Sequence, residues 1–142
     1  PGPFLDLNGN VVGTHRGIIH YTVGQRRGLR MPSDGKIYVV KILPERNAVV
    51  VGPNEALFTR ECLVPGMRWI SGEAPALPFR CSAKTRYRQL EQPCTVYPAG
   101  EAGVRLVFDE PLRAITPGQS AVLYDGDTVL GGGIIAREES VC

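Results

Sequence analysis

The stretch "KTRYRQ", residues 84–89, carries the side chains best suited to binding a charged ligand. Lys84, Arg86 and Arg88 alternate with neutral residues in what reads as the end of a β-strand over residues 79–88. Side chains along a strand point alternately to opposite faces, so the three cations are expected on one face. Such a row can follow the phosphates of a polyanion, but it also fits a solvated strand face. The residues alone leave both interpretations open.

The sequence contains no recognisable catalytic constellation. His15 and His20 are the only histidines, and no acidic or cysteine cluster accompanies them. No serine stands in a G-x-S-x-G turn, and the four cysteines form no C-x-x-C motif. We expect the cysteines to be reduced and packed as small hydrophobic groups. We therefore expect no catalytic residue and no metal site in this chain.

Composition and charge indicate what kind of scaffold positions the cations. The 17 glycines and 12 prolines are scattered among Val- and Ile-rich runs, which is typical of many short strands joined by tight turns. The net charge is only +2, yet residues 1–36 and 66–98 each carry five Lys/Arg against two acids, whereas residues 99–142 carry three against seven. This distribution favours contact with a polyanion at selected places. No apolar run approaches the ~18 residues of a membrane span.

The first part of the chain reads as two hairpins and a short helix. Asn8-Gly9 predicts a tight turn, and "KIYVVKILPERNAVVVG" predicts a second hairpin whose strands are buried on both faces. Between them, Thr14 is a plausible N-cap for a short helix that buries one side. The apolar residues of that side are Ile18, Ile19 and Tyr21. A glycine-bounded loop, residues 25–27, would follow the helix.

A domain boundary is expected at Pro65-Gly66, and a small closed barrel after it. Turn signals about every ten residues separate six strands, as in small barrels. The expected strands are 67–71, 79–88, 94–98, 103–108, 120–124 and 128–136. The "GGG" of residues 131–133 is followed by neither Lys-Ser/Thr nor a helix, so it predicts a bulge or a close backbone approach rather than a phosphate loop.

Three motifs together give the chain a family resemblance. They are G-x-H-x-G-x-x-x-Y-T-x-G-Q-R-x-G-L from Gly13, K-x-R-Y-R from Lys84 and T-P-G-Q-x-A-V-x-Y-x-G-D-x-x-L-G-G-G from Thr116. In this order they resemble the C-terminal half of the bacterial-type tRNA 2-thiouridylases. Those enzymes use ATP, with magnesium, and a cysteine persulfide to place sulfur on C2 of the wobble uridine of certain tRNAs.

The resemblance implies a mainly β architecture for this chain. Residues 1–65 would be a small central β-rich domain with a short helix, and residues 66–142 a six-stranded C-terminal β-barrel similar to the second domain of elongation-factor GTPases. The family's adenylating domain precedes these parts and supplies an S-G-G-x-D-S loop and two working cysteines, none of which is present here. The sequence also starts without methionine. We therefore expect a fragment of a transferase that is inactive by itself and binds no cofactor.

The resemblance also implies roles for individual residues. Arg86, Tyr87 and Gln119 correspond to the family's tRNA contacts. Lys84 and Arg88 are expected as auxiliary phosphate neighbours. Structural alternatives remain open: Tyr87 could pack in the barrel, and Gln119 could stabilise its turn.

A second candidate is the loop of Gln25, Arg26 and Arg27, as an active-site wall or a phosphate contact. Salt bridges from this loop to the absent domain are the alternative.

The expected partners are tRNA, a sulfur-donor protein and the chain's own N-terminal adenylating domain, with no membrane and a cytoplasmic location. A standalone interaction module that has no link to sulfur transfer is the competing hypothesis.

Overall fold

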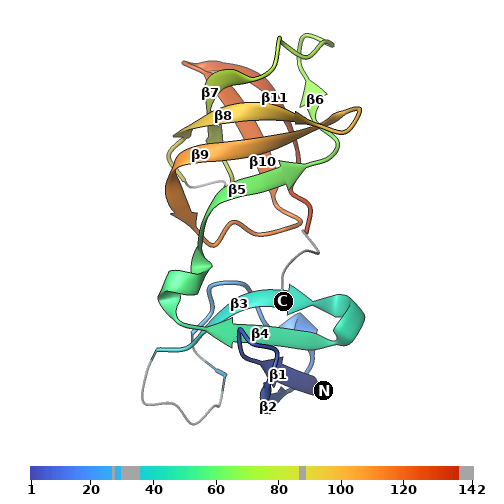
Figure 1. The fold of residues 1–142 in the computed structure, drawn as a ribbon, viewed down its shortest axis with the longest axis vertical. Coiled ribbons are helices and arrows are strands. Elements are labelled where there is room, and N and C mark those ends of the chain that lie inside the picture. Colours follow the sequence, from blue (N-terminus) through green and yellow to red (C-terminus); the bar gives the residue numbers. More distant parts are fainter. Residues whose placement is uncertain (27, 30–35, 87–88, 138–142) are drawn as a thin grey trace. The chain divides into compact units, whose positions relative to one another are not determined.

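The computed structural model describes residues 1–26, 28–29, 36–86 and 89–137. The chain divides into two compact units, the first comprising Pro1–Phe58 and the second beginning at Thr59. Within the described ranges the secondary structure is β-strand and three short 3-10 turns, with no α-helix (Figure 1). The mainly β class is thereby confirmed. The domain division expected at residue 65 stays a prediction.

The first unit is built on a four-stranded sheet with the order β2-β1-β4-β3 (Figure 1). Its strands are β1 (Gly2–Leu5), β2 (Val11–His15), β3 (Tyr38–Leu43) and β4 (Ala48–Gly52). The pairs β1–β2 and β3–β4 are antiparallel, and β1 and β4 run parallel between them. The two predicted hairpins are therefore present, joined through their inner strands.

Strand β4 is covered on both faces. Val49 and Val51 pack with Phe4 in one apolar cluster, whereas Ala48 and Val50 pack in another. Alternate residues of a strand point to opposite faces, so a strand covered on both sides shows an unbroken apolar run. The prediction of burial on both faces is confirmed for β4 and wrong for β3, an edge strand whose residues are mostly half-buried.

The first hairpin turn is held by one carboxylate. Asp6 Oδ1 accepts hydrogen bonds from the backbone N–H groups of Asn8 and Asn10, both at 2.9 Å. Gly9 has a φ of 86°, as the predicted Asn-Gly turn requires. The hydrogen bond from the Asn10 backbone, with those from Asn8 and Gly9, lowers the pKa of Asp6 despite some desolvation.

The short helix expected after Thr14 is not formed. Thr14 lies inside β2, and only a 3-10 turn, Ile18–His20, follows it. Gly17, which precedes that turn, has a φ of 129° and gives no side-chain cap, so no α-helix is started there. Tyr21 is buried as predicted, but Ile19 is 89 % exposed.

The second unit is a seven-stranded curled sheet in the order β5-β9-β8-β7-β10-β11-β6. Its strands are β5 (Phe58–Val64), β6 (Arg68–Trp69), β7 (Phe79–Lys84), β8 (Gln92–Ala99), β9 (Gly103–Arg113), β10 (Ser120–Asp125) and β11 (Thr128–Ile134). All six predicted strands are present, and the count of six is corrected to seven. β5 was missed because Arg60 and Glu61 interrupt its apolar pattern, whereas Arg60 Nε in fact donates to the carbonyl of Phe108, 3.0 Å away.

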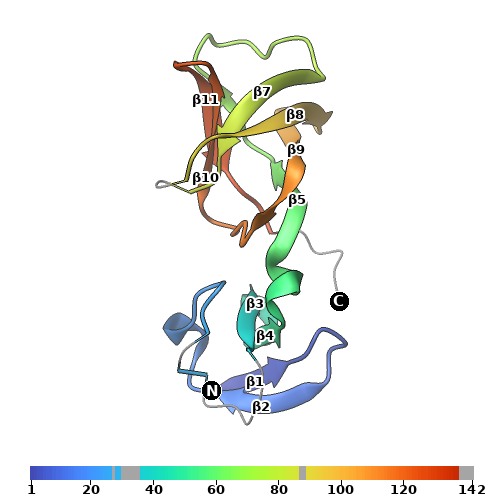
Figure 2. The ribbon, with the colours of Figure 1, turned by 90° about the vertical axis from the view of Figure 1, so that its left-hand side faces the viewer.

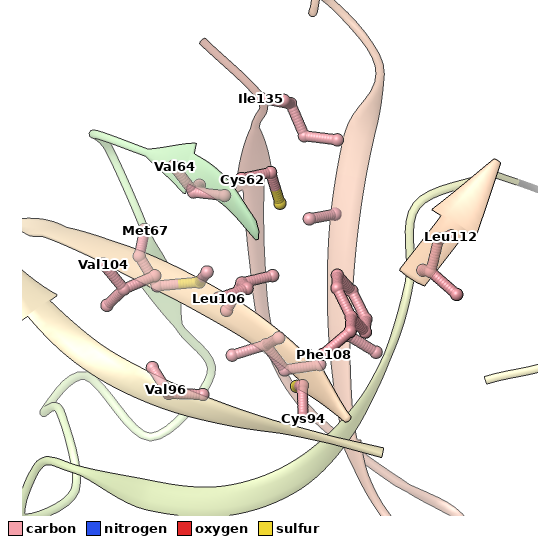
Figure 3. Close-up of a cluster of buried hydrophobic side chains, with 13 residues drawn as sticks. Cys62, Val64, Met67, Cys94, Val96, Val104, Leu106, Phe108, Leu112 and Ile135 are labelled. Carbon is pink, nitrogen blue, oxygen red and sulfur yellow. The ribbon is translucent and has the colours of Figure 1, made fainter. Parts of the chain in front are cut away.

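The sheet curls around one core into a half-barrel. Figure 2 shows β10 and β11 on the opposite side of this unit from β9 and β5. A single β-bridge, in which Ala136 N–H donates to the Leu63 carbonyl at 2.9 Å, joins β5 to the residues after β11. Thirteen buried side chains fill the interior (Figure 3), among them Val64, Leu106 and Phe108.

The glycines of β11 allow backbones to approach closely. A Cβ added to Gly131 would overlap the carbonyl oxygen of Arg68 in β6, and one on Gly133 would lie 2.9 Å from the Gly66 carbonyl oxygen. The prediction of a close backbone approach is therefore confirmed, and these residues are part of a strand rather than a phosphate loop. No helix in the described part of the chain has the length and apolar character to cross a membrane.

Candidate nucleic-acid interface

A hollow of about 550 Å³ lies where β7 ends beside β10. It is lined by Lys84, Thr85, Arg86, Gly118, Gln119, Ser120, Val122 and Tyr124. The antiparallel pairing of β7 with β10 sets Lys84 opposite Val122. Three of the residues predicted to bind tRNA, namely Lys84, Arg86 and Gln119, are thus brought together from parts of the chain that are distant in sequence.

The expected row of three cations along a strand face is wrong. β7 ends at Lys84, and Arg86 lies in a bend after it. Arg88 and Tyr87 lie outside the described residues, so their predicted roles stay predictions. The hollow therefore receives Lys84 from the strand and Arg86 from the bend.

The bend is held by a buried threonine. Thr85 is 2 % exposed, and both its backbone N–H and its Oγ1 donate to Gln89 Oε1, at 3.0 and 2.9 Å. Gln89 N–H in turn donates to the Arg86 carbonyl at 3.3 Å. These bonds tie both Thr85 and the carbonyl of Arg86 to Gln89. Thr85 and Gln89 belong to the predicted motif, but their positioning role was not predicted.

Arg86 is itself oriented by the chain. Its Nη2 donates to the carbonyl of Ala114 at 2.8 Å, and Thr116 Oγ1 donates to the same oxygen at 2.9 Å. Ala114 has a φ of 58°, an uncommon conformation for a non-glycine residue. Arg86 Nε is buried and has no hydrogen-bond partner among the described residues. A buried donor without an acceptor is costly, so this orientation of Arg86 depends on the two bonds to the Ala114 carbonyl.

Lys84 lies beside an aromatic ring. Its Nζ is 5.5 Å from the centroid of the Tyr124 ring, a cation–π geometry. Both residues line the hollow, and both are half-buried. Tyr124 was not predicted, because only the register between β7 and β10 brings it next to Lys84.

Gln119 is presented by a turn whose hydrogen bonds come from the backbone. Gln119 N–H donates to the Thr116 carbonyl at 3.2 Å, and the Gln119 carbonyl accepts from Ile135 N–H at 2.9 Å. Gly118 has a φ of 92°, as expected for the third residue of a type II turn whose second residue is a proline. Gln119 is exposed at the hollow. These two bonds involve only backbone atoms of Gln119, so the turn does not use its side-chain amide.

Gln25 and Arg26 belong to the first unit, whereas the residues that line the hollow belong to the second. Gln25 Oε1 accepts from Thr22 N–H at 2.9 Å, and its backbone pairs with Val39. Gln25 thus orders its own loop within the first unit. Arg26 is exposed, and Arg27 lies outside the described residues.

The buried histidine His15 has structural contacts on both ring nitrogens. His15 is 1 % exposed; its Nδ1 accepts from Gly17 N–H at 2.9 Å, and its Nε2 therefore donates to the Asn47 carbonyl, 2.7 Å away. Its ring meets Phe4 and Tyr21 edge-on. No group of three or more His, Cys, Asp or Glu residues suited to a metal ion occurs in the described ranges.

Comparison with known proteins relates both units to one kind of enzyme. Residues 59–135 match the family model described as the aminomethyltransferase β-barrel domain, and residues 1–53 match the tRNA methyl transferase PRC-barrel domain. The chain is similar over most of its length to curated proteins named tRNA-specific 2-thiouridylase MnmA. The chain belongs to the tRNA-specific 2-thiouridylase family.

Relatives from distant bacteria show similar identity to this chain. The protein of Acetivibrio thermocellus is 49 % identical over 135 residues, which is 95 % of this chain and 38 % of the relative. That of Synechocystis is 47 % identical over 139 residues, 98 % of this chain and 39 % of the relative. That of Halothermothrix orenii is 44 % identical over 135 residues, which is 95 % of this chain and 38 % of the relative. The chain thus spans less than two-fifths of the length of these 2-thiouridylases.

Proposed function

We propose that this chain binds tRNA through the hollow at the end of β7 and so positions the tRNA for 2-thiolation of its wobble uridine. The observation that carries the proposal is the convergence of Lys84, Arg86 and Gln119 on one hollow. An ammonium and a guanidinium suit phosphate oxygens, and an exposed amide can reach a base edge or a 2′-hydroxyl. The family membership and the names of the relatives support tRNA as the polyanion.

In this proposal the chemistry belongs to a part of the enzyme outside this chain. The proposal assigns no ATP site to the described residues, since Gly131–Gly133 lie within strand β11 rather than in a phosphate-binding loop. The chain's own contribution is to bind and orient the RNA, since small misplacements of a reacting group lower rates strongly. The adenylating domain, the sulfur-donor protein and the elongation-factor-like barrel are parts of the same proposal.

The proposal is tested by the salt dependence of tRNA binding. The probe is an unmodified tRNA transcript with uridine at the wobble position, titrated with the 142-residue chain at several salt concentrations. Arg86→Ala should weaken binding and reduce the slope of log affinity against log salt by about 0.7–0.9, the value for one phosphate contact. Lys84→Gln, which leaves the Ala114 contact of Arg86 intact, should reduce the slope similarly.

Arg80→Ala is the matched control. Arg80 lies on the same strand and carries the same charge, but it is paired with Asp109 at 2.6 Å and does not line the hollow. If Arg80→Ala lowers the affinity and slope as much as the Arg86 and Lys84 variants, binding is a nonspecific charge effect. If neither Arg86→Ala nor Lys84→Gln changes them, the hollow is not the tRNA site and the chain is better explained as a module for another partner.

A further inference from the structure

Two thiols face each other across neighbouring strands of the second unit. Cys81 on β7 is directly opposite Cys94 on β8 in the antiparallel register, and their Sγ atoms are 3.8 Å apart. Residues directly opposite in such a pair have Cα atoms about 4.5–5.5 Å apart, within the range that a disulfide spans. The proposed tRNA site uses neither thiol.

The two cysteines differ in their surroundings. Cys94 is fully buried in the core shown in Figure 3, whereas Cys81 is half-buried at the edge of that core. The hydrogen bond from Cys94 lowers the pKa of the Cys81 thiol, and the charge of Arg80 contributes in the same direction. The same hydrogen bond, followed by burial, raises the pKa of Cys94. Cys81 is therefore the partner that ionises first and that a small reagent reaches first.

We propose that Cys81 and Cys94 form a peroxide-sensitive dithiol site that closes reversibly to a cross-strand disulfide. The Cys81 thiolate attacks one oxygen of hydrogen peroxide; an S–O bond forms, the O–O bond breaks, and hydroxide leaves and is protonated to water. The Cys94 sulfur then attacks the Cys81 sulfenic acid, so that an S–S bond forms and the S–O bond breaks. The second oxygen leaves as water with the Cys94 proton. Two thiols and one peroxide thus give one disulfide and two waters.

The arrangement makes Cys94 a resolving thiol. A sulfenic acid on a half-exposed cysteine is oxidised further when no second thiol is near, whereas here the second sulfur is already in hydrogen-bond contact. The resulting disulfide would join the two central strands β7 and β8 of the curled sheet, three residues before Lys84.

The experiment treats the reduced 142-residue chain with hydrogen peroxide, blocks remaining thiols with N-ethylmaleimide and identifies linked peptides by mass spectrometry. We expect a Cys81–Cys94 link and a chain mass lower by two hydrogen atoms. Neither cysteine should then react with N-ethylmaleimide, and dithiothreitol should restore both reactive thiols. Cys62→Ala is the matched control, because Cys62 is buried in the same core but is not paired in register with Cys81, and it should leave the link unchanged. Cys94→Ser should trap the Cys81 sulfenic acid, which is detected with dimedone.

A second measurement does not depend on the folding of any variant. Dibromobimane bridges two neighbouring thiols and becomes fluorescent when both sulfurs have reacted, so the native reduced chain should yield a fluorescent Cys81–Cys94 adduct. Conversion of Cys81 to the sulfinic acid without a link, a link from Cys94 to Cys62 instead, or no bimane bridge would each overturn the proposal.

Discussion

Arg86 illustrates how a residue predicted from a motif acquires its specific geometry from the fold. The sequence supplies an arginine suited to phosphate, but the Ala114 carbonyl already uses one of its N–H groups. The remaining guanidinium is held in place, so binding would order less side-chain motion than a free arginine requires. Arg86 lines the hollow, and its predicted contact with tRNA stays a prediction. The prediction from sequence missed the internal contact because Ala114 is 28 residues away in the chain.

At the same scale, Thr85→Val tests whether the buried hydroxyl positions the site. Valine keeps the shape of threonine but removes the donor to Gln89 Oε1, which should lower the free energy of unfolding by about 1–2 kcal/mol. Because the bend also holds Arg86, tRNA affinity should fall as well. Chemical unfolding and tRNA titration measure the two effects.

Thr95→Val is the control for this substitution. Thr95 Oγ1 accepts a hydrogen bond from Arg80 at an exposed position, where removal changes stability by about 0.5 kcal/mol or less. Equal stabilities of the two variants would show that the Thr85 hydroxyl does not hold the bend.

At the scale of elements, β11 depends on backbone contacts that a side chain would prevent. Gly131→Ala would push its Cβ into the backbone of Arg68 in β6, and backbone cannot move aside as a flexible side chain can. We expect separation of β6 from β11 and a loss of about 1–3 kcal/mol in unfolding free energy. Thermal unfolding followed by circular dichroism measures the loss.

The matched control for the glycine is Gly66→Ala. A Cβ at Gly66 would meet no heavy atom within 4 Å, so this change should be close to neutral. A Gly131→Ala variant as stable as Gly66→Ala would mean that β6 is not held against β11 in solution.

The elements that the sequence predicted well are those with an uninterrupted local signal. The hairpins around Gly9 and Asn47 and the six strands of the second unit follow from short apolar runs and turn residues. The failures have nonlocal causes. Thr14 joins β2 because pairing with β1 outweighs its capacity as a cap, and β5 gains its strand identity from pairing with β9. Likewise, Tyr124 joins the hollow only through strand register.

At the scale of the whole molecule, the chain has separate apolar cores in its two units. One set of clusters is built around Phe4 and β4, and the other around Leu106 and Phe108. Each unit has its own sheet, so the strand hydrogen bonding of one does not depend on the other. Two such units are expected to unfold as separate cooperative transitions, each lost when its own core is weakened.

The chain's single tryptophan makes this expectation measurable, because Trp69 belongs to the second unit and its fluorescence reports that unit alone. Leu106→Ala removes a fully buried side chain from the second core and should lower the stability seen by Trp69 by about 2–5 kcal/mol. Val49→Ala, equally buried but in the first core, should leave the Trp69 urea midpoint unchanged while circular dichroism shows an earlier transition. If Val49→Ala instead shifts the Trp69 urea midpoint together with the transition seen by circular dichroism, the two units unfold as one body.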